Sequence, residues 1–168
     1  QKSNELMERL SDRFLVDDTS NQSMDDIWRK VSLYRPDLVV IDHLGLVNSR
    51  EENEVQALGE ISNMSKALAK QFDIPVMALY QLNRGTEARD NKRPMMSDLR
   101  GSGKIEENAD NIFFLYRPDY YDEAKPDQQT VSKTELIISK FRDGIRNIYV
   151  YLQFQLDEQW FYPEAREA

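Results

Sequence analysis

The segment RPDLVVIDHLG, residues 35–45, carries the clearest information about the fold of this chain. It contains four consecutive aliphatic residues, three of them β-branched, and the run ends on a carboxylate at Asp42. Such a run is typical of a strand buried on both faces, as the central strands of parallel sheets are. Aspartate is a poor strand residue and is costly to bury without a partner, so Asp42 indicates that the strand opens into a crevice there. Open α/β sheets bind ligands in such a crevice, outside the carboxyl ends of the strands.

A second apolar strand repeats this arrangement further along the chain. The run VMALY, residues 76–80, follows Pro75 and ends on the polar Gln81. A long helix with an apolar stripe is predicted between the two strands, over residues 52–72. A strand, a helix and a strand in this order imply a parallel pair joined by a right-handed crossover. Asp42 and Gln81 would then share one crevice, where the carboxylate can hold Mg²⁺ and the amide can sense a γ-phosphate or orient water.

The remaining patterns complete a mostly parallel α/β sheet flanked by helices, with an antiparallel hairpin at its C-terminal edge. Turn residues at Arg142, Asp143 and Gly144 separate two apolar arms, which is a hairpin signal. The second arm alternates in character, as expected for a strand with one wetter face. Further elements are predicted at residues 2–10 (helix), 13–16 (strand), 23–33 (helix with Ser23 as N-cap), 112–116 (buried strand), 136–140 and 148–156 (hairpin arms) and 159–162 (strand).

The composition sets limits on the class of protein. A length of 168 residues fits one domain with a sizeable core. The chain has no cysteine and one histidine, which excludes disulfide scaffolds, thiolate metal sites, cysteine nucleophiles and histidine-rich metal sites. No apolar run reaches the length of a membrane span, and the N-terminus has no signal-peptide core. We therefore expect a soluble, cytoplasmic protein with no membrane partner.

The charge of the chain is unevenly distributed. A net charge of −8 argues against a surface that attracts nucleic acid everywhere. Residues 84–104, in contrast, hold six basic residues against three acidic ones, a local charge of +3. This segment contains no aromatic residue, so it suits contacts with phosphates better than stacking on bases. Taken alone, the segment is equally compatible with an ordinary solvated loop.

Three segments carry a specific resemblance to a known family. These segments are IDHLGL, then PVMALYQLNRGTEARDNKRPMMSDLRGSGKIEENADNIFFLYR, then ISKFRDG. In this order and spacing they resemble the RecA-like motor domain of DnaB-type replicative DNA helicases. The likeness runs from about Phe14 to Trp160. It implies a single RecA-like ATPase domain over residues 1–168, from an ATP-dependent enzyme that translocates on single-stranded DNA and unwinds duplex DNA.

The resemblance also implies roles for individual residues. Asp42 matches the aspartate that anchors Mg²⁺ at the ATP site, and Gln81 matches the glutamine that couples the γ-phosphate to the DNA-binding loops. Lys140 and Arg142 match a catalytic basic pair that reaches the ATP site of the neighbouring subunit in a hexameric ring. The loop that grips single-stranded DNA would contain Arg100, Gly101, Gly103 and Lys104. ATP and Mg²⁺ are the implied cofactors, and primase and a helicase loader are the implied protein partners.

Part of the family pattern is missing from this sequence. No G-x-x-x-x-G-K-[ST] phosphate loop occurs in it, and GSGK at residues 101–104 lacks the spacing and the preceding buried strand. We therefore expect the strand, loop and helix of the Walker A part to lie outside this chain, and the chain alone to be inactive. Single positions also depart from the family: His43 and Gly45 replace a tyrosine and a glutamine, Tyr80 replaces a serine, and Gly101 replaces an acidic residue.

Other interpretations stay open for each site. Asp42 alone can be a turn cap, and Gln81 alone can be satisfied by a backbone amide. Lys140 and Arg142 can form ion pairs on an exposed hairpin, for example with Glu135 or Asp143. For the whole chain, two alternatives are a non-catalytic module that binds single-stranded DNA or a helicase ring, and a relative of RecA-type recombinases.

Overall fold

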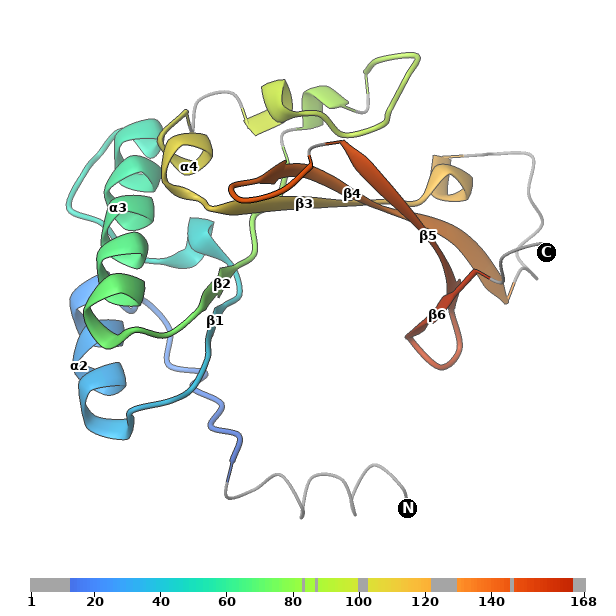
Figure 1. The fold of residues 1–168 in the computed structure, drawn as a ribbon. Helices are drawn as coiled ribbons and strands as arrows, with labels where there is room; N and C mark the ends of the chain where they lie inside the picture. Colours follow the sequence, from blue (N-terminus) through green and yellow to red (C-terminus); the bar gives the residue numbers. More distant parts are fainter. Residues whose placement is uncertain are drawn as a thin grey trace.

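The computed structural model describes residues 13–82, 84–86, 88–99, 103–121, 130–145 and 147–164. Within them, β1 and β2 pair in parallel, and β3, β4, β5 and β6 form a separate antiparallel sheet in that order. The two sheets and the helices make an arch, with α2, α3 and α4 at one end and β6 at the other (Figure 1). The elements are α2 (Met24–Tyr34), β1 (Val39–Ile41), η1 (Leu44–Leu46), α3 (Glu54–Phe72), β2 (Val76–Ala78), η2 (Arg84–Thr86), η3 (Met96–Leu99), α4 (Gly103–Asn108), β3 (Asn111–Tyr116), η4 (Pro118–Tyr121), β4 (Val131–Phe141), β5 (Ile148–Gln155) and β6 (Trp160–Pro163).

Helix α2 begins where the sequence predicts it. Ser23 is its N-cap, and its hydroxyl accepts a hydrogen bond from the Asp26 N–H while the Asp26 carboxylate accepts one from the Ser23 N–H. This reciprocal pair satisfies two of the donors that a helix N-terminus leaves free. The helix ends at Arg35, whose left-handed conformation (φ 48°) turns the chain toward β1.

The parallel pair is packed against the long helix. Strands β1 and β2 align Val40 with Met77 and Ile41 with Ala78. A buried cluster joins these strands to α2, α3 and α4, with Leu68 of α3 fully buried at 0% exposure. The predicted helix and both strands are confirmed, and the strands are shorter than the apolar runs that contain them. The buried members of the cluster are Met24, Val31, Ile41, Leu44, Leu58, Ile61, Leu68 and Ile105.

The α/β class is confirmed, although the balance between the sheets differs from the prediction of a mostly parallel sheet. The third apolar run, β3, pairs antiparallel with β4 and is not hydrogen-bonded to β2. An apolar run indicates that a strand is buried, but it does not indicate which strand it pairs with. Here β3 pairs with the first hairpin arm, because this arm extends over eleven residues as β4 and pairs with the whole length of β3.

The N-terminal predictions have two outcomes. The predicted helix at residues 2–10 lies outside the described residues. The predicted strand at residues 13–16 is wrong: this stretch forms no strand, and Phe14, Leu15 and Val16 are exposed. A short apolar run needs a neighbouring strand to complete its hydrogen bonds, and no strand in the described part of the chain pairs with it. Among the described helices, none is both long and apolar enough to cross a membrane.

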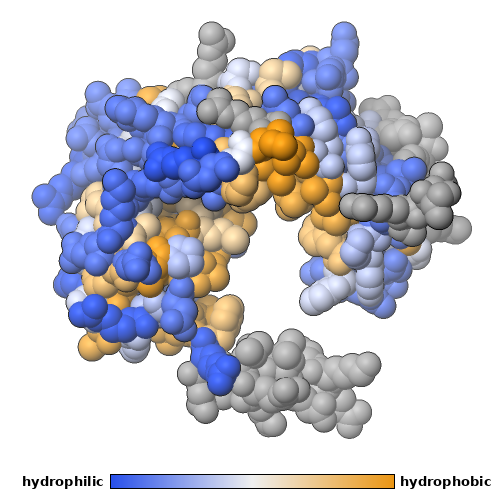
Figure 2. All heavy atoms as spheres, viewed as in Figure 1, coloured by the Kyte–Doolittle hydropathy of each residue, from blue (hydrophilic) through white to orange (hydrophobic). Residues whose placement is uncertain are grey.

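One face of both sheets is left uncovered, and we call it the open apolar face. In the antiparallel sheet, register places Phe113 beside Ile138 and Ile148, and Leu115 beside Leu136 and Val150. Figure 2 shows apolar side chains lining the hollow of the arch. Parallel sheets are normally covered on both faces, and large exposed apolar patches mark interaction surfaces. The most exposed members, each between 37% and 59% exposed, are Leu38, Val40, Met77, Leu79, Phe113, Leu115, Ile148 and Val150.

Candidate functional site

Asp42 and Gln81 lie beyond the carboxyl ends of two neighbouring strands, as the sequence predicts. Asp42 follows β1 directly, and Gln81 follows β2 after Leu79 and Tyr80. The pairing continues past the strands, because the Leu79 N–H donates to the Ile41 carbonyl (2.9 Å) and the Leu44 N–H donates to the Leu79 carbonyl (2.9 Å). The acid and the amide therefore belong to the same end of one parallel pair.

Both side chains are available to a ligand. Asp42 and Gln81 are exposed, and within the described residues neither side chain makes a hydrogen bond or an ion pair. A carboxylate without a partner fits a metal ion, and Mg²⁺ is commonly held by only one or two carboxylates with water completing its shell. In the described part of the chain, no group of three or more acidic, histidine or cysteine side chains forms a larger metal cluster.

The residues after Asp42 support the backbone rather than the chemistry. His43 is the N-cap of η1, and its Nδ1 accepts a hydrogen bond from the Gly45 N–H (3.2 Å). A Cβ at position 45 would lie 3.0 Å from the His43 ring, so the two residues that depart from the family pattern fit each other closely. His43 therefore acts as a cap in this structure.

Only part of the predicted DNA-binding loop lies within the described residues. Arg100 and Gly101 lie outside them, whereas Gly103 begins α4 and Lys104 is exposed on its first turn. Lys104 forms an ion pair with Glu107 (2.7 Å).

Acidic partners also reduce the free positive charge of residues 84–104. Arg89 pairs with Asp98 (2.7 Å), and Arg93 pairs with Glu135 of β4. The Glu135 carboxylate raises the pKa of Arg93. Asp98 is already counted in the local charge of +3, but Glu107 and Glu135 lie outside residues 84–104, so the value of +3 overstates the positive charge that is free to meet a phosphate.

A β-bulge determines where Lys140 points. Ile112 is opposite Lys140 and Phe113 is opposite Ile138, so Ser139 is an extra residue on β4. Opposed residues in an antiparallel pair share a face, and a bulge redirects the side chains beyond it. Lys140 therefore lies on the α4 side of the sheet with the buried Ile112, not on the open apolar face with Ile138.

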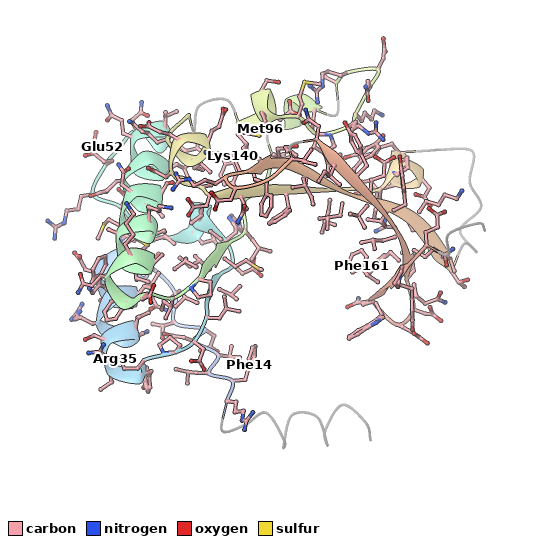
Figure 3. All side chains as sticks on the ribbon, viewed as in Figure 1. Phe14, Arg35, Glu52, Met96, Lys140 and Phe161 are labelled. Carbon is pink, nitrogen blue, oxygen red and sulfur yellow. The ribbon has the colours of Figure 1, made fainter. Side chains whose placement is uncertain are left out.

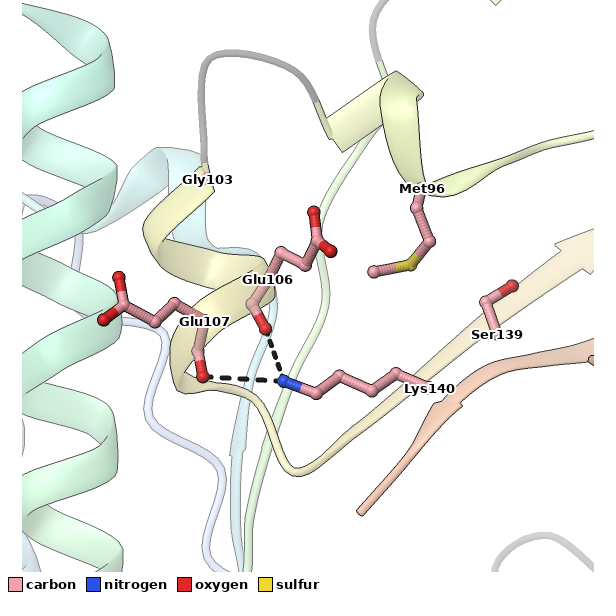
Figure 4. Close-up of a pocket in the computed structure, with 6 residues that line it drawn as sticks. All are labelled: Met96, Gly103, Glu106, Glu107, Ser139 and Lys140. Atoms are coloured by element: carbon pink, nitrogen blue, oxygen red, sulfur yellow. Dashed lines mark hydrogen bonds between the residues drawn. The ribbon is translucent and has the colours of Figure 1, made fainter. Parts of the chain in front are cut away.

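Lys140 contacts the C-terminal end of α4, and Arg142 contacts Asp110, which lies two residues after that helix. Lys140 Nζ donates to the carbonyls of Glu106 (2.6 Å) and Glu107 (3.5 Å) at the C-terminal end of α4 (Figure 4). Arg142 Nη1 lies 2.6 Å from Asp110 Oδ1. Asp110 is thus the ion-pair partner of the hairpin arginine, whereas Glu135, one of the two partners considered from the sequence, pairs with Arg93.

Asp110 also pairs with a lysine from a distant part of the chain. Its other carboxylate oxygen accepts a hydrogen bond from Lys66 of α3. The Lys66 hydrogen bond, together with the charges of Lys66, Arg142 and Lys140, lowers the pKa of Asp110 below its usual value despite partial burial. Sequence analysis assigned a role to neither residue: Asp110 lies in a segment that carries the family resemblance, but Lys66 lies outside these segments and is 44 positions away.

An open pocket of about 530 Å³ lies between α4 and β4, beside the basic pair rather than at the strand ends. Figure 3 places Lys140 at the α4 end of the sheet, with Met96 above it and Phe161 at the opposite end. The pocket is lined by Met96, Gly103, Glu106, Glu107, Ser139 and Lys140. It therefore adjoins the described end of the predicted DNA-binding loop.

These features define an α/β domain with a RecA-like fold, and comparisons with known proteins identify its family. The model of the family "DnaB-like helicase C terminal domain" matches residues 1–162, and the chain belongs to this family. It is 43% identical over 136 residues to the replicative DNA helicase DnaB of Geobacillus stearothermophilus, covering 77% of this chain and 29% of that protein. It is 40% identical over 136 residues to the replicative DNA helicase DnaC of Bacillus subtilis, with the same coverage.

Two solved structures have the same fold. One is an isolated ATPase domain, which superposes with a TM-score of 0.77 at 38% identity, covering 86% of this chain and 52% of that one. The other is a DnaB-like replicative helicase, whose structure was solved together with its interactions with primase. It superposes with a TM-score of 0.78 at 37% identity, covering 90% of this chain and 38% of that one. The chain spans less than a third of the length of the two bacterial relatives and about half of the solved ATPase domain.

Proposed function

We propose that this chain is the C-terminal part of the motor domain of an ATP-dependent replicative DNA helicase. By "full-length protein" we mean this chain together with the rest of that domain and protein. The observation that carries the proposal is the parallel pair β1–β2, which presents an unpartnered acid and amide at adjacent strand ends. Membership of the DnaB-like family supports the reaction class.

In this proposal, Asp42 and Gln81 form one wall of the Mg²⁺–ATP site. A bound Mg²⁺ would supply the positive charge that offsets the charge developing on the transferred phosphoryl group. Asp42 would hold the metal ion, and Gln81 would contact the γ-phosphate region with an amide that can both donate and accept. The phosphate loop comes from residues outside this chain, because the sequence contains no such motif.

Lys140 and Arg142 act on the ATP held by a neighbouring subunit, in a hexameric ring of the full-length protein. Arg142 lies in the turn between β4 and β5, and its side chain is 52% exposed. A guanidinium at the tip of a hairpin can reach beyond its own domain, and its fork of donors suits a phosphate. This placement supports a role in trans.

The experiment that tests the proposal compares the isolated chain with the full-length protein in a Mg²⁺–ATP hydrolysis assay. The isolated chain should show no turnover, because it lacks the backbone amides and lysine that bind the phosphates. The full-length protein should hydrolyse ATP and be stimulated by single-stranded DNA. Robust turnover by the isolated chain would show that the nucleotide site is assigned to the wrong residues.

The DNA-binding role rests on Arg100, Gly101, Gly103 and Lys104. We predict that Arg100→Ala in the full-length protein weakens single-stranded DNA binding equally for different base sequences, because a phosphate contact is lost. The slope of log affinity against log salt should fall by about 0.7 for each contact removed. A filter-binding or anisotropy titration at several salt concentrations measures both quantities. Arg29→Ala, which removes an exposed arginine of α2, is the matched control. Weaker binding to only some sequences would contradict a contact with the backbone.

A non-catalytic module is the second candidate function, and the missing phosphate-loop motif is the observation that favours it. The reading frame upstream of this chain separates the candidates: a phosphate loop there supports the motor. A relative of RecA-type recombinases is less well supported, because the family match is to DnaB-like helicases. As a helicase, the protein would act in the cytoplasm and bind primase, as the solved DnaB-like relative does, and a helicase loader.

A further inference from the structure

Asp110 occupies the junction between the helix that follows the DNA-binding loop and the strand beside the basic hairpin. It lies between α4, which ends at Asn108, and β3, which begins at Asn111. Its backbone carbonyl accepts a hydrogen bond from the Arg142 N–H (3.0 Å). One residue therefore contacts Arg142 through both its main chain and its carboxylate, which fixes the start of the turn and the guanidinium together.

The carboxylate is itself held in place by α3. One oxygen accepts from Lys66 and the other lies 2.6 Å from Arg142 Nη1. The Lys66 side chain is only 20% exposed, and its helix is anchored in the core by the fully buried Leu68. Asp110 and Lys66 thus connect an exposed arginine to one of the most firmly packed helices of the domain.

Lys140 provides a second connection, to α4. It donates to the last carbonyls of α4, whose negative dipole end favours a cation. The first residue of the same helix is Gly103, which is itself one of the predicted DNA-binding residues. A shift of α4 would therefore change the environment of Lys140 and, through Asp110, that of Arg142.

We propose that Asp110, braced by Lys66, is a positioning residue that holds Arg142 for its action on the neighbouring ATP, and that α4 makes this position depend on the DNA-binding loop. The inference rests on the proposed function, because it assumes that Arg142 acts in trans. Asp110 touches neither the nucleotide nor the DNA. It restricts a long side chain that would otherwise sample many rotamers, and the placement of a catalytic group strongly affects the rate.

Asp110→Asn in the full-length protein tests the positioning role. Asparagine keeps the size of the side chain and removes the charge that binds Lys66 and Arg142. We expect DNA-stimulated kcat to fall by about 10- to 100-fold, as for a misplaced catalytic group. The KM for ATP and the affinity for single-stranded DNA should stay unchanged. Asp25→Asn is the matched control: it makes the same acid-to-amide change at an exposed position on α2, outside the proposed ATP and DNA sites, and it should keep full activity.

A mixed-ring experiment distinguishes positioning in trans from damage to the variant's own site. Asp110→Asn subunits keep Asp42, whereas Asp42→Asn subunits keep Asp110 and Arg142. If Asp110 serves the neighbour, mixing the two impaired variants should restore hydrolysis at sites that combine an intact Asp42 from one subunit with an intact Asp110 and Arg142 from the other. Mixing Arg142→Ala with Asp42→Asn subunits tests the underlying proposed function in the same way.

Each combination of outcomes has one meaning. Recovery in both mixtures supports the positioning role. Recovery with Arg142→Ala but not with Asp110→Asn overturns the role of Asp110 and leaves the proposed function intact. Failure of the Arg142→Ala mixture overturns the trans-acting function itself. Unchanged or raised kcat in Asp110→Asn also overturns the inference, since raised activity would mean that the carboxylate restrains Arg142 instead of positioning it.

Discussion

Replacing Arg142 by alanine in the full-length protein should lower DNA-stimulated ATP hydrolysis by about 10³-fold or more, the usual contribution of an arginine finger. ATP binding should be largely retained, because Asp42, Gln81 and the phosphate loop are untouched. The reason is structural: Arg142 lies at an exposed hairpin turn that follows β4, whereas Asp42 and Gln81 follow the separate parallel strands β1 and β2. Steady-state hydrolysis, combined with fluorescent-nucleotide binding, separates the two effects.

Arg29→Ala controls for the loss of a surface arginine. Arg29 is highly exposed on α2 and pairs only locally with Asp26, so hydrolysis should not change. Arg142→Lys should recover little, because a lysine keeps the charge but not the planar fork that binds two phosphate oxygens. Turnover equal to that of the unmodified protein in Arg142→Ala would remove this residue from the mechanism.

Local patterns in the sequence predicted most of the individual elements. The capping residues of α2, the apolar stripe of α3 and the turn residues at 142–144 each act within a few positions, so the sequence shows them directly. The strand-end location of Asp42 and Gln81 was also predictable, because a β–helix–β order fixes which ends of two parallel strands coincide.

Contacts between distant segments could not be predicted in the same way. The Lys66–Asp110–Arg142 connection joins three elements whose residues have no shared motif. The bulge at Ser139 is another example: simple alternation would place Lys140 on the same face as Ile138, and the extra residue reverses this. Both features depend on how the hairpin is aligned with β3, which the order of apolar residues does not specify.

The prediction that β1 is buried on both faces differs from the structure in an informative way. Ile41 faces the core, while Val40 belongs to the open apolar face. A run of four aliphatic residues is typical of a strand covered on both faces, and only one cover is present among the described residues. We therefore propose that a further segment of the ATPase domain, outside this chain, packs on the open apolar face, as expected for a chain that spans about half of a solved ATPase domain.

Leu115→Ala tests this proposal through stability. Leu115 is 59% exposed in this chain, so its truncation should change the free energy of unfolding of the isolated chain by no more than about 0.5 kcal/mol. In the full-length protein, where we expect the side chain to be covered, the same change should cost about 2–4 kcal/mol, as for a buried leucine. Chemical denaturation of both proteins, with and without the substitution, measures the difference.

Leu68→Ala is the matched control, because Leu68 is fully buried in α3 and should cost about 2–5 kcal/mol in either protein. A loss for Leu115→Ala that appears only in the full-length protein would mean that the open apolar face is an internal surface of the ATPase domain. The same covering segment could then carry the phosphate loop to the ends of β1 and β2, because the face and the strand ends belong to the same strands. An equally small loss in both proteins would show that the face stays exposed, and the phosphate loop would have to approach Asp42 and Gln81 by another route.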